Sequence, residues 1–172
     1  MDIEIVHLKE PKIIAGFSVE TTLENNAQDL DLLYSDFLHN GKREILNSIT
    51  KNNHEYYGVI WYTILHKKYI YLLGQKVVTK IDEGNIDFKI IPEGTYCKSK
   101  FPAKYDGIKA WTDFYSLEIP QTGYKPKEID DIAFNIITMD LTVNLSCGLW
   151  LKRNKRCLRE CWINKLFPQK KK

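Results

Sequence analysis

The stretch Tyr56–Val77 reads YYGVIWYTILHKKYIYLLGQKV and predicts a β-hairpin. β-branched and aromatic residues dominate it, as expected of side chains that pack on a pleated surface. They alternate, so one face of the first strand carries Tyr57, Val59, Trp61 and Thr63, and the other carries Tyr56, Gly58, Ile60 and Tyr62. We expect His66-Lys67-Lys68 to make the turn and Gly74 to end the second strand. One apolar face can pack on helices, and the other presents an aromatic wall that suits a ligand.

The 172 residues are enough for one domain with a real core. No apolar run approaches the length of about 20 residues that a membrane-spanning helix needs. The first residues alternate charged and apolar side chains, which is not the pattern of a secretory signal. We therefore expect a soluble, cytoplasmic protein whose four cysteines are reduced rather than bridged.

Charge is distributed unevenly along the chain. Residues 152–172 hold nine Lys or Arg residues and one acid, a net charge of +8, and the total of +3 leaves −5 for residues 1–151. An acidic body with aromatic walls favours cationic ligands and argues against specific nucleic-acid binding by the folded part.

The predicted elements repeat in order. A strand at 13–22, a helix at 27–39 and strands at 56–63 and 69–73 are followed by a strand at 95–100, a helix at 107–117 and strands at 132–138 and 144–152. Further strands are expected at 3–6, 77–80 and 87–91, with Asp106 capping the second helix. Two such βαββ halves predict an α+β fold with an antiparallel sheet, two main helices and a ligand pocket where the halves meet.

Four motifs, taken in order, resemble one known family. They are FSVETTLENN with the helix after it, YYGV followed by Tyr69-x-Tyr71-x-x-Gly74, IIPEGTY (Ile90–Tyr96) and GIKAWTDFYSLEIPQTGY (Gly107–Tyr124). The set is similar to the GyrI-like family, the effector-binding domain of bacterial transcription activators and of stand-alone multidrug-binding relatives. The resemblance covers most of residues 13–138.

The resemblance implies a duplicated βαββ domain at residues 1–152 that binds lipophilic, often cationic, small molecules in an aromatic pocket. It implies no catalytic residues, no metal and no cofactor, although some relatives act as gyrase inhibitors or hydrolases. The chain contains no phosphate-binding glycine loop, no Gly-x-Ser-x-Gly elbow and no zinc-ligand spacing among its histidines. The alternative hypothesis is a protein-interaction module, like a regulator or gyrase inhibitor, that acts through its surface or tail, or as a homodimer.

One position departs from the family. Many members carry a glutamate in the strand after the second helix, where this chain has Asn135. Glu118 falls seven residues beyond Trp111 and three beyond Tyr115, so we expect it to replace the missing counter-charge. The predicted ligand-binding residues are Tyr34, Phe37, Tyr57, Trp61, Tyr71, Tyr96, Trp111, Tyr115, Glu118, Phe134 and Asn135.

The basic tail at residues 153–172 does not resemble the end of the family domain. Cys157, Leu158, Cys161, Trp162 and Leu166 could form the apolar stripe of a partner-binding helix. The same segment resembles read-through from the recombination site of an integron cassette, and the sequence leaves both interpretations open.

Overall fold

The computed structural model describes residues 3–50, 55–63, 68–80, 84–101, 111–126, 132–138 and 145–153. The strands in this part of the chain are β1 (Ile3–Leu8), β2 (Lys12–Thr22), β3 (Glu55–Thr63), β4 (Lys68–Val77), β5 (Asp87–Ile91), β6 (Gly94–Phe101), β7 (Tyr124–Pro126), β8 (Ile132–Thr138) and β9 (Leu145–Arg153). The helices are α1 (Asn26–His39), α2 (Lys42–Thr50) and a segment at 111–122 that ends in a π turn (Phe114–Glu118) and a 3₁₀ turn (Ile119–Thr122). The predicted hairpin turn, the Asp106 cap and the basic tail beyond Arg153 lie outside the described residues.

The strands form one antiparallel sheet in the order β1-β6-β9-β8-β3-β4-β2-β5, with β7 paired to β9. One half contributes β2-β4-β3 and the other contributes β6-β9-β8, and the two halves meet where β3 pairs with β8. In each half the first strand lies on the outside, the third strand lies next to it, and the second strand lies at the junction of the halves. This arrangement confirms the predicted duplicated βαββ fold.

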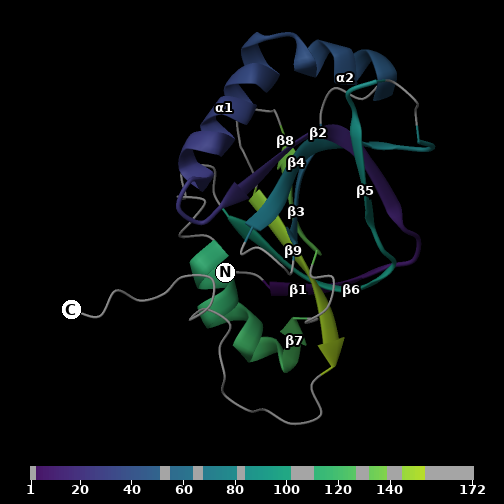
Figure 1. Cartoon of the computed structure of the whole chain (residues 1–172). Coiled ribbons are helices and arrows are strands. Elements are labelled where there is room, and N and C mark those ends of the chain that lie inside the picture. Colours follow the sequence, from purple (N-terminus) through teal and green to yellow (C-terminus); the bar gives the residue numbers. More distant parts are fainter. Residues whose placement is uncertain are drawn as a thin grey trace.

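The sheet also curls and closes on itself. β1 and β2 are consecutive in the chain and are separated only by a short bend, so that together they form one bent strand, and the same holds for β5 and β6. The two bent strands pair along their lengths, so that Leu8 lies opposite Gly94 in one pair and Lys12 opposite Ile91 in the other. The curl gives the sheet an inner face and an outer face. Figure 1 shows α1 and α2 across the top of the curled strands and the segment 111–122 (green) below α1, at the lower left.

Three apolar clusters fill the spaces that this arrangement creates. The first lies between α1, α2 and the outer face of β2, β3 and β4, around Phe37 and Tyr56. The second lies between the segment 111–122 and the outer face of β1, β6 and β8, around Phe114 and Cys97. The third fills the inside of the curl, around Tyr57 and residues of β2, β4, β6 and β8. The alternation predicted for the hairpin is confirmed, because neighbouring tyrosines of β3 enter different clusters.

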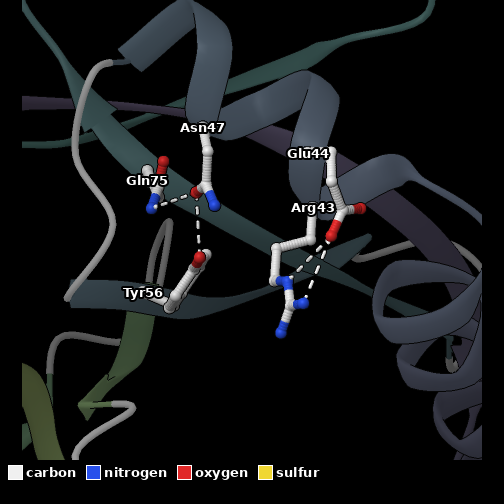
Figure 2. Close-up of polar contacts among 5 residues, drawn as sticks. All are labelled: Arg43, Glu44, Asn47, Tyr56 and Gln75. Atoms are coloured by element: carbon white, nitrogen blue, oxygen red, sulfur yellow. Dashed lines mark hydrogen bonds and ion pairs between the residues drawn. The ribbon is translucent and has the colours of Figure 1, made fainter.

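A buried polar network holds α2 against the sheet (Figure 2). Asn47 Oδ1 accepts hydrogen bonds from the Tyr56 hydroxyl at 2.9 Å and from Gln75 Nε2 at 3.0 Å. Thr50 Oγ1 donates to the other end of the Gln75 amide. Gln75 has no exposed surface, and these partners satisfy an amide that would otherwise be buried without hydrogen bonds.

Two sequence predictions about this region are wrong. The separate strand expected at 77–80 is not formed, because β4 continues without a break to Val77 and ends there. Residues 42–50, for which no element was expected, form α2, and its buried side chain is Leu46. Gly74 does not end its strand. It lies inside β4 opposite Gly16 on one side and Tyr57 on the other. A Cβ atom on Gly74 would collide with the backbone carbonyl of Ala15, so the glycine permits close approach of two strands.

Candidate ligand-binding site

One row of paired residues crosses the outer face of the sheet where the halves meet. It runs through Val19, Tyr71, Ile60, Ala133, Leu149, Cys97 and Ile5, each opposite the next. Tyr71 lies under α1, and Cys97 packs with the segment 111–122. Four strand spacings separate them, about 19 Å along the sheet. Ile60 packs against both outer clusters, so it connects the part of the sheet under α1 with the part under the segment 111–122. We call these two helical elements the walls of the candidate site and the sheet between them its floor.

The wall on the α1 side is formed by two tyrosines. α1 starts after Asn25 and places Leu33 and Phe37 against the sheet, which leaves Tyr34 at the edge of the cluster. The hydroxyls of Tyr34 and Tyr71 share a hydrogen bond of 2.7 Å, and their ring centroids are 6.2 Å apart. Burial raises the pKa of the Tyr34 hydroxyl, which the bond to Tyr71 partly offsets. The Tyr34 hydroxyl therefore stays protonated at physiological pH.

The opposite wall is the segment 111–122. The rings of Trp111 and Tyr115 lie 5.9 Å apart with a 33° angle between their planes, and both side chains are half-buried. Phe114 and Glu118 are buried, while Leu117 between them is exposed. The π turn brings Phe114 and Glu118 onto the side that faces the sheet, and such turns are frequent at functional sites.

Glu118 is a buried carboxylate without a visible partner. The residue is 4% exposed, and among the described residues neither carboxylate oxygen has a hydrogen-bond partner. The hydroxyl of Ser99, which has no exposed surface, is also unpaired within the described part of the chain. Burial raises the pKa of the Cys97 thiol to about 12, and the nearby Glu118 carboxylate contributes to this rise. Cys97 and Ser99 share one face of β6, and Cys97 packs with the segment 111–122.

The inner face of the curl holds four of the predicted site residues. Tyr57, Trp61, Tyr96 and Phe134 pack there with aliphatic residues. Lys12 Nζ lies 5.3 Å from the centre of the Tyr57 ring, and Lys89 Nζ lies 4.4 Å from that of Trp61. The protein's own lysines therefore occupy ring faces that were expected to meet a cationic ligand.

The remaining predicted residues fall elsewhere. Phe37 is buried in the first cluster, with edge-to-face contacts to Phe17 at 6.5 Å and to Tyr56 at 5.4 Å. Asn135 pairs with Gly58 across the junction of the halves, and its side chain lies outside the described residues. The predicted residues are thus divided among three clusters. Those beside the junction on the outer face are Tyr34, Tyr71, Trp111, Tyr115 and Glu118.

A separate open groove of about 720 Å³ lies at the junction of α1 and α2. Its lining includes Phe17, Asn40, Lys42, Ile45 and residues 84–87, and none of the predicted ligand-binding residues. Lys42 pairs with Asp36 at 3.0 Å and lies 5.2 Å from the centre of the Phe17 ring. The lining therefore carries one lysine, which is paired with Asp36, and one acid, Asp87, so its charge alone does not select the sign of a ligand.

Comparison with known proteins relates this architecture to a family. The sequence model of the GyrI-like small molecule binding domain matches residues 1–152. The chain belongs to the GyrI-like family. Its membership confirms the resemblance that the four sequence motifs indicated. None of the curated protein sequences matches the chain.

Solved structures show the same GyrI-like fold at low sequence identity. An integron cassette protein from the mobile metagenome of Vibrio cholerae is 12% identical, with a TM-score of 0.59 over 87% of this chain and 95% of that one. The protein SAV2435 bound to tetraphenylphosphonium is 11% identical, with a TM-score of 0.68 over 88% of this chain and 93% of that one. A bacterial transcription regulation protein from Staphylococcus aureus is 13% identical, with a TM-score of 0.59 over 88% and 97%.

Sequence reasoning missed two groups of residues in this GyrI-like chain. Ile60 and Ala133 form the floor of the junction, and their role depends on strand pairing that the local pattern does not specify. Cys97 and Ser99 could have been noticed, because they alternate along β6 with Tyr96 and Lys98. No helix within the described residues is long and apolar enough to cross a membrane.

The buried thiol of this GyrI-like domain leads to a first prediction. Because Cys97 is buried and its pKa is raised to about 12 from an ordinary 9.0, it should remain a thiol at pH 8 and react with iodoacetamide only after unfolding. The folded-state pKa lies above the unfolded value, so Cys97 stabilises the fold below pH 9 and loses that effect as the pH rises towards 12. Peptide mapping by mass spectrometry should show Cys97 unlabelled in native protein and labelled in denaturant. Equal labelling in both states would contradict its burial.

Proposed function

We propose that this chain binds lipophilic, aromatic cations on the outer face of its sheet, over the junction of β3 and β8, and does not transform them chemically. α1 and the segment 111–122 supply the aromatic walls, and Ile60 with Ala133 supplies the floor. Tetraphenylphosphonium, the compound bound to SAV2435, is a suitable probe of this chemistry.

The observation that carries the proposal is the row of paired residues between the two helical walls. At the junction the row contains Ile60 and Ala133, which are smaller than Tyr71 beside them and than the aromatic rings of the segment 111–122. Tyr34, Trp111 and Tyr115 are half-buried, so each keeps some surface that a ligand can cover. An apolar floor between aromatic walls is the usual composition of a small-molecule site.

Charge and apolar contact both favour a cation at this place. Covering apolar surface contributes about 25 cal/mol per Å². A cation over Trp111 or Tyr115 would gain about 0.5–2 kcal/mol per ring where water is excluded. The buried carboxylate of Glu118 lies in the same helical wall, and a cation beside it would offset its desolvation. The same Glu118 disfavours an anion.

Titration with tetraphenylphosphonium tests the proposal. The chain has four tryptophans, and we expect the ligand to quench tryptophan fluorescence and to raise the melting temperature. Trp111→Phe should remove most of the quenching, and Trp111→Ala should weaken binding by about 0.5–2 kcal/mol because it loses the largest ring of the wall.

Trp61→Phe is the matched control. Trp61 lies on the inner face beneath Lys89, so its replacement should leave the quenching unchanged. The opposite result, in which Trp61→Phe removes the quenching and Trp111→Phe does not, would move the site inside the curl. Absence of any binding would reject the proposed function.

A further inference from the structure

We infer that Glu118 and Ser99 form a hydrogen-bonding subsite that selects cations carrying N–H groups, such as protonated primary amines, over quaternary cations of the same shape. The inference rests on the proposed function and specifies the ligand class of that same site. The subsite would bind the charged head of the ligand, whereas the aromatic walls would contact its apolar body.

The subsite follows from three acceptor atoms that are buried without donors. Both oxygens of Glu118 and Oγ of Ser99 lack a hydrogen-bond partner among the described residues, although both residues are more than nine-tenths buried. Leaving such groups unpaired is costly, and most buried polar groups in folded proteins have partners. A ligand that supplies donors would remove this cost on binding.

Both unpaired groups are related in position to Cys97. Glu118 acts electrostatically on Cys97, and Ser99 lies two residues further along the same face of β6, about 7 Å from Cys97. A direct bond from the Ser99 hydroxyl to Glu118 would satisfy both, and it is not formed. An ammonium group carries three donors on one atom, so it can bond the carboxylate and the hydroxyl at the same time.

Donor-free cations cannot make these bonds. A phosphonium or tetraalkylammonium ion carries charge but no N–H, so it leaves Ser99 Oγ unpaired and meets Glu118 only through space. Sites built to bond an N–H or O–H group reject analogues that lack it far more strongly than apolar pockets reject a change of size. Selection among cations should therefore depend on N–H count as well as on charge.

Three ligands with one aromatic body separate these effects. Biphenyl-4-ylmethylamine is a primary ammonium at pH 7, its N,N,N-trimethyl analogue keeps the charge without donors, and biphenyl-4-ylmethanol has a donor without charge. Calorimetric titration of the full chain should give the primary ammonium about tenfold to hundredfold tighter binding than the trimethyl analogue. Glu118→Gln and Ser99→Ala should each bring that ratio towards one, and Ser99→Ala should leave binding of the trimethyl analogue unchanged.

Four results would overturn the inference. Equal affinity of the native protein for the two cations would show that a bound water or the site's charge alone satisfies Glu118. If Glu118→Gln weakens the binding of both cations equally, Glu118 contributes through its charge and not through hydrogen bonds. Binding of tetraphenylphosphonium but none of the biphenyl ligands would reject the subsite and leave the proposed function standing. If tetraphenylphosphonium also fails to bind, both fall. Circular dichroism of each variant verifies folding, and Ser99→Ala provides an independent test if Glu118→Gln is misfolded.

Discussion

Replacing Gly74 by alanine is expected to destabilise the protein by about 3 kcal/mol or more. The added methyl group would collide with the carbonyl group of Ala15 and approach the Leu72 side chain to 2.9 Å. Because the first obstacle is backbone, relief requires β2 and β4 to separate at the pair Gly16–Gly74, in the middle of their ladder. Chemical denaturation should show a lower midpoint at an unchanged slope.

Gly84→Ala is the matched control, because an added Cβ there meets no atom within 4 Å. It should change the free energy of unfolding by less than about 0.5 kcal/mol. A Gly74→Ala protein as stable as the native one would mean that the two strands are further apart than described.

Glu118→Met is expected to have the opposite effect on stability, raising the free energy of unfolding of the ligand-free protein by about 1–3 kcal/mol. Methionine keeps the length of the side chain and removes a buried carboxylate that has no partner among the described residues. The same change should abolish any preference for cations. Denaturant melts of the ligand-free variant and titrations with tetraphenylphosphonium measure the two effects.

Glu24→Met makes the same substitution at an exposed position, and its stability should stay within about 0.5 kcal/mol of the native value. If Glu118→Met instead lowers stability, Glu118 is engaged in the folded state and the carboxylate is structural. A gain in stability with a loss of binding is the trade-off typical of functional sites.

The sequence predicted those parts of the fold that depend on local patterns. Alternation placed Tyr56 and Tyr57 on different faces, and helical periodicity predicted a helix at 27–39, which the structure shows as α1. It did not predict the curl, which depends on pairing between residues 3–22 and 87–101. The aromatic residues on the second face of the hairpin were therefore assigned to a ligand wall, whereas the closed sheet packs them against its own side chains.

For the candidate site, too, local spacing was informative and the remaining geometry was not. Spacing from Trp111 and Tyr115 indicated that Glu118 would turn inward, and the structure buries it. The π turn that aligns Glu118 with Phe114 has no recognisable sequence signal, so the depth of burial and the neighbouring Ser99 could not be predicted.

The two halves of the chain exchange their leading strands. β1 precedes the first half but pairs with β6 of the second, and β5 precedes the second half but pairs with β2 of the first. Each half thus completes the sheet of its neighbour, and neither half contains the pairing partner of its own leading strand. Either half by itself would carry a leading strand whose pairing partner lies in the other half, so it could form that pairing only by exchanging the strand with a second copy of itself.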